Sequence, residues 1–214
     1  MSAGAIAAES TCYGSSANGR LERGVKLPSE GVNFISYSKT AEIAGRTYVH
    51  SKVKTIILAA YERLEHEAPG KVYKYAETGF KEGGQFKPHK THRNGLSVDF
   101  MVPVTNASGQ SVHLPTHYFN KLGYAIEFDD FGQYQVYTID YEAMAAHIVS
   151  LHKAAVAYNA NLWRVIFDPK LQSFLLKTQY ADYLKKYITF SKKPSWVRHD
   201  EHYHVDFDLP CKTL

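Results

Sequence analysis

The chain has 214 residues, enough for one substantial domain with a proper core or at most two small ones. Hydrophobic residues make up 44% and charged residues 21%, an ordinary globular composition that excludes wholesale disorder. The net charge of +4 suits an acidic partner, but no Lys/Arg block, RNA-binding aromatic signature or zinc-finger Cys pattern occurs. We therefore expect no nucleic-acid partner, and no apolar run is long enough to predict a membrane span.

The N-terminal part of the chain divides into a loop-like segment and a helix. Residues 1–45 are rich in Gly, Ser and Asn and predict an extended arm over the surface. The first ten residues lack the charged start and the long apolar stretch of a leader. In "HSKVKTIILAAYERLEHEAPG" (50–70), apolar residues recur at helical spacing until Pro69-Gly70, which predicts an amphipathic helix.

The middle of the chain predicts strands and loops. "KVYKYAE" (71–77) alternates like a strand, and a Gly-punctuated loop follows it. Between residues 103 and 139, "GYAIEF" and "YQVYTI" flank the turn "DDFGQ", which predicts a loop and a hairpin.

The second half predicts helices around one buried strand. Asp140 is a plausible N-cap for a helix over 140–159, and the apolar run "LWRVIF" (162–167) fits a strand buried on both faces. Asp168-Pro169 predicts another helix start, with one or two helices running to about Tyr187. No repeat or linker interrupts the chain. The sequence thus predicts a single α+β domain over 1–214, with a small antiparallel sheet flanked by helices.

The two cysteines, Cys12 and Cys211, lie near opposite ends of the sequence. Two cysteines do not build a Cys-rich zinc site. They either form one disulfide in an oxidising compartment or remain unrelated free thiols, and the sequence alone leaves both readings open.

Histidines and acids are concentrated in two stretches that read as strands. In 96–102, period-two alternation puts Asp99 on the polar face of an otherwise apolar strand. In 202–209, His202, His204, Asp206 and Asp208 share one face, and apolar residues take the other.

Two such strands can converge on one metal ion. His92, Asp99 and His204 supply two imidazoles and one carboxylate, the ligand types of a catalytic Zn²⁺ site that keeps its fourth position open. Taken singly, each is explained more simply, as a loop histidine, a hydrogen-bonded acid or part of an exposed polar turn. Their combination, reached through a Gly-rich loop, favours a metal site.

These residues also carry a family resemblance. "HRNGLSVD" (92–99) has the pattern His-x-x-Gly-x-Ser-x-Asp, and "HYH" (202–204) is His-x-His. The chain resembles the zinc peptidase superfamily of lysostaphin-type enzymes, D-Ala-D-Ala peptidases and hedgehog domains, and within it the penicillin-insensitive murein endopeptidases. "GGQFKPHKTH", "HDEHYHV", "RVIFDPKL" and "GRLERGVKLP" also fit that family. The resemblance covers most of the chain and is weakest over 103–139.

The resemblance implies a role for each candidate residue. His92, Asp99 and His204 become the zinc ligands, His202 the catalytic acid/base, and His199 a further active-site histidine. Glu201 stands three residues before His204, and Glu-x-x-His is the pattern in which the dipeptidase branch uses the Glu as base. The base is therefore His202 first and Glu201 second, while His89 binds a second metal, orients substrate or lies at the surface.

The implied function is zinc-dependent hydrolysis of peptide cross-links or stems of peptidoglycan, in the periplasm or at the cell wall. A D,D-dipeptidase, a carboxypeptidase or a phage-type lysin of the same superfamily remains an alternative. From another class, so does a non-catalytic zinc-containing module that binds the cell wall. Such a module needs only the three ligands, whereas this chain also carries His199, Glu201 and His202, which favours an enzyme.

Overall fold

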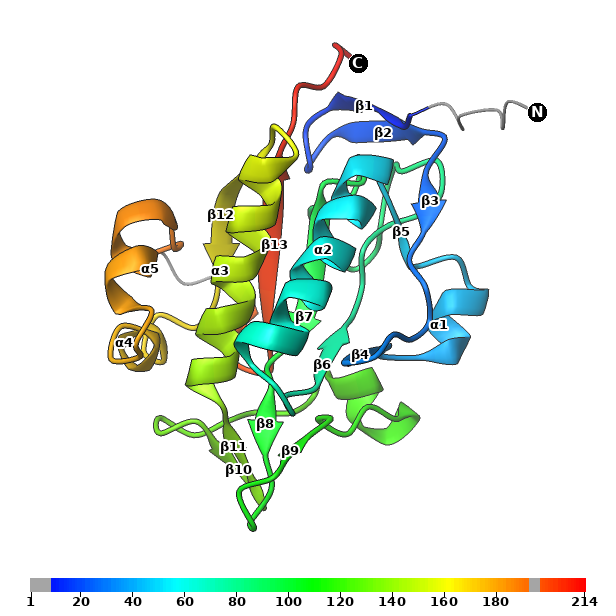
Figure 1. The fold of residues 1–214 in the computed structure, drawn as a ribbon. Helices are drawn as coiled ribbons and strands as arrows, with labels where there is room; N and C mark the ends of the chain where they lie inside the picture. The colour runs from blue at the N-terminus through cyan, green and yellow to red at the C-terminus, as the bar shows by residue number, and fades with distance from the viewer. Residues whose placement is uncertain (1–8, 193–196) are drawn as a thin grey trace, which may run out of the picture.

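A five-stranded sheet forms the centre of the protein, and two long helices cross one of its faces (Figure 1). The computed structural model describes residues 9–192 and 197–214. The strand order is β12-β13-β7-β6-β4, and every neighbouring pair is antiparallel except β4 and β6. The strands of this sheet are β4 (Phe34–Ser36), β6 (Tyr73–Tyr75), β7 (Ser97–Met101), β12 (Asn161–Ile166) and β13 (His202–Asp208). The predicted α+β class with a small antiparallel sheet and flanking helices is confirmed.

Smaller elements surround this centre. Two-stranded sheets pair β1 with β2 and β3 with β5, and a four-stranded sheet has the order β10-β11-β8-β9. Their bounds are β1 (Thr11–Gly14), β2 (Gly19–Glu22), β3 (Val25–Lys26), β5 (Tyr48–Val49), β8 (Val104–Thr105), β9 (Ser111–Val112), β10 (Gln133–Tyr134) and β11 (Tyr137–Ile139). The helices are α1 (Lys39–Ile43), α2 (Ser51–Glu67), α3 (Tyr141–Ala157), α4 (Gln172–Leu175), α5 (Ala181–Tyr187) and the 3₁₀ segment η1 (Tyr118–Gly123).

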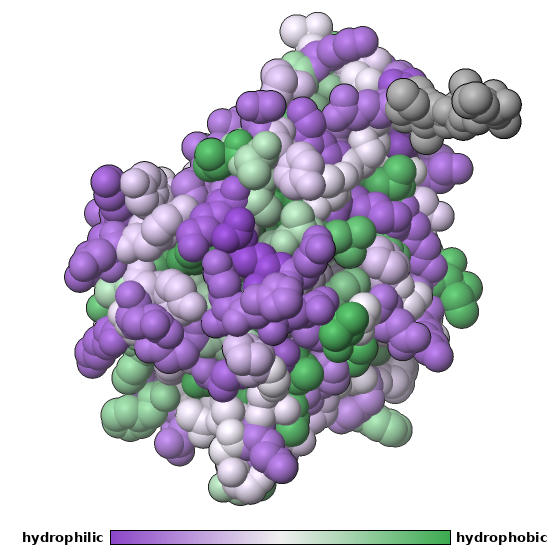
Figure 2. Space-filling model, in the orientation of Figure 1, coloured by the Kyte–Doolittle hydropathy of each residue, from purple (hydrophilic) through white to green (hydrophobic). Residues whose placement is uncertain are grey.

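Helices α2 and α3 form where the sequence predicts them. The apolar side chains that recur at helical spacing in α2 are buried, so this helix packs one apolar stripe inward. Asp140 begins α3, because its carboxylate accepts a hydrogen bond from the Ala143 N–H at 2.9 Å. Figure 2 shows the outer side of these helices, where hydrophilic residues dominate and apolar ones are scattered. No helix among the described residues is long and apolar enough to cross a membrane.

The segment 1–45 is more than the predicted surface arm over its described part, which starts at residue 9. β4 forms an edge of the central sheet, and Leu21, Leu27 and Phe34 belong to the buried core. The prediction was wrong there because strands of two to four residues among Gly and Ser leave no periodic pattern in the sequence. Such a short strand as β4 is stabilised by its pairing with β6, which the local sequence does not show.

Three other local predictions need correction. Residues 123–128 form no strand, and the hairpin is the short pair β10–β11, whose turn lies at Gln135 and Val136. Strand β12 is an edge strand with Trp163 55% exposed, so it is not buried on both faces. Asp168 caps a turn rather than a helix: its carboxylate accepts from the Lys170 N–H at 2.8 Å, and α4 begins at Gln172. The prediction of one or two helices running to about Tyr187 is confirmed, since α4 and α5 are present and α5 ends at Tyr187.

The helix-covered face of the sheet is an aromatic core around a buried histidine. His147 of α3 is fully buried, and its ring lies against Tyr61, Tyr73, Phe100 and Tyr203. Its Nδ1 pairs with the Tyr203 hydroxyl. Burial lowers the pKa of His147 to about 3, so this side chain is neutral at pH 7.

The neutral His147 predicts a pH-dependent stability. Its unfolded pKa is near ~6.5, so between that value and about 3 the unfolded chain binds a proton that the native protein does not. Stability therefore falls as the pH drops below 6.5, by about 2 kcal/mol from pH 7 to pH 5 for this one group. Urea unfolding of chelator-treated protein at both pH values measures it, and His147→Gln should show a drop smaller by that amount. An equal drop in both proteins would contradict the assignment.

A disulfide joins Cys12 of β1 to Cys211, 199 positions later, which settles the choice that the sequence left open. The same two segments exchange backbone hydrogen bonds, from Lys212 N–H to the Cys12 carbonyl and from Gly14 N–H to the Lys212 carbonyl, both at 2.9 Å. The strand pair β1–β2 is thereby fastened to the exit of β13.

Removing this disulfide should destabilise the protein. The chain-entropy account gives on the order of 4–5 kcal/mol for so long a loop, with strain reducing the effect. The Cys12→Ala, Cys211→Ala double variant should unfold at a lower denaturant concentration than the oxidised wild type. The reduced wild type serves as the matched control and should resemble the double variant. Equal midpoints for oxidised and reduced wild type would show that the bond does not stabilise the fold.

Candidate active site

The pairing of β7 with β13 brings the two histidine-rich stretches together. Asp99 is the register partner of His204, and Met101 that of His202. Residues directly opposite each other on antiparallel strands project to the same face. Asp99 and His204 therefore share a face, and Phe100 and Tyr203 take the other, against α3. The site thus lies on the side of the sheet opposite α2 and α3, as the alternation of both strands predicted.

Asp99 is the centre of the cluster and is completely buried. Its Oδ1 lies 2.8 Å from His204 Nδ1 and 3.3 Å from His92 Nε2. Its Oδ2 accepts a hydrogen bond from the Tyr124 hydroxyl at 2.9 Å and lies 3.8 Å from His202 Nε2. Burial alone would raise the pKa of Asp99, but the surrounding imidazoles hold it well below the ordinary value. The carboxylate is therefore ionised at neutral pH.

His92 presents a free lone pair to this carboxylate. Its Nδ1 lies 3.0 Å from the Thr78 carbonyl oxygen, so Nδ1 carries the proton and Nε2 does not. Nε2 is buried and has no hydrogen-bond partner. Burial lowers the pKa of His92, which keeps the ring neutral. A buried, unprotonated nitrogen facing a carboxylate at 3.3 Å is suited to binding a cation.

The loop that carries His92 is held close to its neighbours. His92 has a positive φ of 66°, a conformation that L-residues adopt only when the surrounding contacts require it. A Cβ on Gly79 would lie 2.8 Å from the His92 carbonyl oxygen, so only glycine fits there. Gly79 follows Thr78, whose carbonyl accepts from the His92 ring. The same short segment therefore fixes both the backbone and the tautomer of His92.

His204 lies between two carboxylates. Its Nδ1 faces Asp99, and its Nε2 lies 3.0 Å from Oδ1 of Asp206, though outside the angular range of a good hydrogen bond. Burial lowers the pKa of His204, but the charges of Asp206 and Asp99 outweigh it and raise the pKa to about 10. The two carboxylates thus favour a positive charge at this ring. A metal cation next to Nδ1 would satisfy the same field after displacing the Nδ1 proton.

His202 and Glu201 form a pair beside the cluster. His202 Nδ1 is 2.8 Å from Glu201 Oε1, so this carboxylate accepts the Nδ1–H and leaves Nε2 directed toward Asp99. Burial opposes protonation of His202, but the charges of Glu201 and Asp99 raise its pKa above the ordinary value. Glu201 keeps its ionised form through the same contact, which lowers its pKa against the effect of burial. The geometry makes Glu201 the orienting partner of His202.

His199 lies next to His202, with ring centroids 4.6 Å apart. Its Nδ1 is 2.9 Å from the Val197 carbonyl oxygen, and its backbone φ is 56°. Burial and the neighbouring charge of His202 lower the pKa of His199 to about 4, so the ring is neutral at pH 7. Its carbonyl accepts from the Asp168 N–H at 2.9 Å, which ties this turn to the segment after β12.

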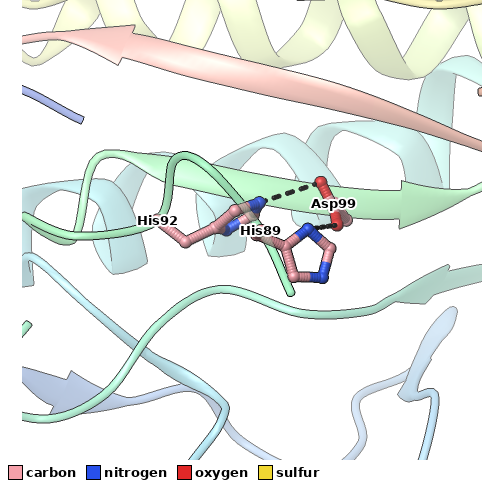
Figure 3. Close-up of side chains that lie close together, drawn as sticks. All are labelled: His89, His92 and Asp99. Atoms are coloured by element: carbon pink, nitrogen blue, oxygen red, sulfur yellow. Dashed lines mark ion pairs between the residues drawn. The ribbon is translucent and has the colours of Figure 1, made fainter. Parts of the chain in front are cut away.

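His89 lies against the same cluster. Its Nδ1 lies 3.9 Å from Asp99 Oδ2, and its Nε2 pairs with Glu77 Oε2 at 2.5 Å. Figure 3 shows the His92 and His89 rings next to Asp99, each facing a different oxygen of its carboxylate. Among the described residues, His89, His92 and Asp99 form a group whose ligand atoms lie within 4.8 Å of one another and could hold a metal ion.

A cleft of about 530 Å³ opens next to this cluster. His89, Glu201 and His202 line it, whereas His92, Asp99 and His204 are not lining residues and are 3% exposed or less. The remaining lining residues are Tyr37, Glu77, Pro88, Lys121, Leu122, Tyr124, Ile126, Glu127, Val197, Arg198 and Asp200. A ligand in the cleft would meet His89 and His202 before the buried group behind them.

The candidate ligands and catalytic residues all lie in or beside this cluster, but two contributors, Tyr124 and Glu77, were not predicted. Tyr124 donates to Asp99, and Glu77 holds His89 while it also accepts from the Tyr37 hydroxyl and from Arg46. Burial raises the pKa of Glu77, but hydrogen bonds from His89 and Arg46 outweigh it and hold the pKa at about 2. The only sequence signal for Glu77 was a carboxylate at the end of a predicted strand.

The comparison with known families agrees with this geometry. No curated protein matches the sequence. The family described as penicillin-insensitive murein endopeptidase matches residues 12–213, which includes every residue of the cluster. Members of this family are metallopeptidases that act on peptidoglycan. The chain, with its buried His/Asp cluster beside an open cleft, belongs to the penicillin-insensitive murein endopeptidases.

Proposed function

We propose that the protein uses one Zn²⁺ ion, held by His92, Asp99 and His204, to hydrolyse peptide cross-links of peptidoglycan. The observation that carries this proposal is the convergence of two imidazole nitrogens on one carboxylate oxygen. His92 Nε2 and His204 Nδ1 both face Asp99 Oδ1, at 3.3 and 2.8 Å. Two nitrogens and one carboxylate are ligand types of catalytic zinc sites, which leave a position open for substrate or water.

His204 is a better third ligand than His89. His89 faces the other oxygen, Oδ2, at the longer distance of 3.9 Å, and its second nitrogen is held by Glu77. We therefore assign His89 to the cleft wall, where it contacts bound substrate. Zn²⁺ in this place would polarise the scissile carbonyl and make a water molecule more acidic.

His202 is the proposed acid/base. Its Nε2 points toward the cluster while Glu201 accepts its Nδ1–H, so Nε2 can take a proton from water and return it to the leaving amine. Glu201 acts through His202, by fixing the tautomer and strengthening its basicity. His199 remains neutral beside His202, so it adds no competing positive charge.

The cleft suits an extended peptide of peptidoglycan. It is open to solvent along one side of the cluster and lined by both apolar and charged groups, including Tyr37, Lys121 and Arg198. A peptide stem that carries carboxylates can pair with such cations.

The disulfide supports export to the periplasm or the cell wall, because disulfides persist in oxidising compartments.

Metal analysis tests the ligand set. The wild type should bind about one Zn²⁺ per chain, and His92→Ala, Asp99→Ala and His204→Ala should each lose it, because three protein ligands are needed for a tight catalytic site. His89→Ala is the matched control and should keep the metal. Loss of zinc in His89→Ala with retention in His204→Ala would replace His204 by His89 in the ligand set.

Paired variants test the acid/base. His202→Ala should retain zinc but lose murein hydrolysis by the ~10²- to 10⁴-fold typical of a general base. Glu201→Gln should have a milder effect, because the amide still accepts the Nδ1–H. Products from purified murein, identified by mass spectrometry with and without chelator, give the rate and the bond cleaved. A nearly active His202→Ala together with an inactive Glu201→Gln, both with full zinc, would make Glu201 the base.

A further inference from the structure

A second carboxylate, Asp206, lies behind the proposed ligand His204. Asp206 is 1% exposed and follows His204 by two positions on β13, so both side chains project to one face. Its Oδ1 lies 3.0 Å from His204 Nε2 and accepts a hydrogen bond from Ser97 Oγ at 2.6 Å. Its Oδ2 accepts from Arg164 Nε at 2.6 Å. The proposed hydrolysis uses none of these contacts.

The other partners of Asp206 hold it in a fixed position. Ser97 comes from β7 and Arg164 from β12, the two strands that flank β13, and both are the register partners of Asp206. Arg164 itself lies over the exposed ring of Trp163, with its guanidinium carbon 4.3 Å from the ring centroid. A buried carboxylate costs free energy unless it is paired and hydrogen-bonded. Asp206 satisfies this condition on both oxygens, and one contact is directed at His204.

The 3.0 Å contact places the Asp206 charge beside one nitrogen of His204, although its angle is outside that of a good hydrogen bond. A ring that keeps its proton on Nε2, next to Asp206, has its lone pair on Nδ1, the nitrogen that faces Asp99. Carboxylates that accept from the outer nitrogen of a ligating histidine fix its tautomer and ring orientation and raise its basicity. If the ring had no partner on Nε2, the proton could move to Nδ1 and block the metal.

We propose that Asp206 is a positioning residue that keeps the His204 proton on Nε2 and thereby presents Nδ1 to the metal. The inference rests on the proposed function, because it needs a metal ion at His92, Asp99 and His204. It assigns Arg164 and Ser97 the role of fixing Asp206. Asp206 touches neither substrate nor metal in this assignment.

The Zn²⁺ affinity of the purified protein, measured by competition with a chromophoric chelator, tests the inference. Asp206→Asn keeps the size of the side chain and removes its charge, and should weaken zinc binding about 10- to 100-fold. Asp208→Asn is the matched control, because it makes the same change two residues further along β13 at an exposed position. Its zinc affinity should equal that of the wild type.

Arg164→Gln separates positioning from a purely structural ion pair. If Asp206 served only to pair with Arg164 across β12 and β13, both variants would lower the melting temperature alike and neither would change zinc affinity. We expect Arg164→Gln to lower stability but to weaken zinc binding less than Asp206→Asn does, because Ser97 still holds Oδ1 of Asp206. In the zinc-loaded protein, nitrogen-15 NMR should show a protonated Nε2 on His204 in the wild type, exchanging faster with solvent in Asp206→Asn.

The outcomes distinguish this inference from the proposed function. Failure of the wild type to bind zinc would overturn the proposed function itself. Tight zinc binding by the wild type, with the same affinity in Asp206→Asn, would overturn the positioning role of Asp206 and leave the ligand set intact.

Discussion

The active site depends on one buried carboxylate. Asp99 has no exposure to water, and its ionised form is stable only because imidazoles and the Tyr124 hydroxyl surround both of its oxygens. A carboxylate in such a place must be paired, since an isolated buried charge is very costly. The partners come from three separate parts of the chain: the loop that carries His92, the strand that carries His204 and the segment of Tyr124. Their positions are therefore constrained by the same requirement, which a bound cation also satisfies.

The central sheet keeps an apolar core on one face apart from the buried charged cluster on the other. One face of β7 and β13 packs aromatic rings against α3 around the neutral His147, and the opposite face carries the charged cluster. The strict alternation of strands makes this separation possible, since adjacent residues such as Phe100 and Asp99 serve different faces. The helices stabilise the sheet without entering the site.

Much of this arrangement could be predicted from the sequence, because it depends on short-range periodicity. Alternation in 96–102 and 202–209 placed Asp99 and His204 on polar faces, and helical spacing predicted α2 and α3. The parts that could not be predicted depend on long-range pairing. Strand β4 has three residues and forms by pairing with β6, and Tyr124 lies in a segment whose predicted strand is absent. The contact of Asp206 with His204 was equally hidden, because a shared strand face does not show which acid turns toward a ring.

The long separation between the site's parts has a consequence for when activity can arise. Asp99 and His204 are 105 positions apart, and the disulfide that fastens the exit of β13 spans 199. Contacts so distant in the sequence form late, because closing large loops costs entropy before any contact compensates it. We expect a chain in which only the first half has folded to be inactive, since both His202 and His204 lie on β13 near the C-terminus. For a peptidoglycan hydrolase, the topology thus acts as a safeguard: hydrolysis begins only after strand β13 has been inserted between β7 and β12.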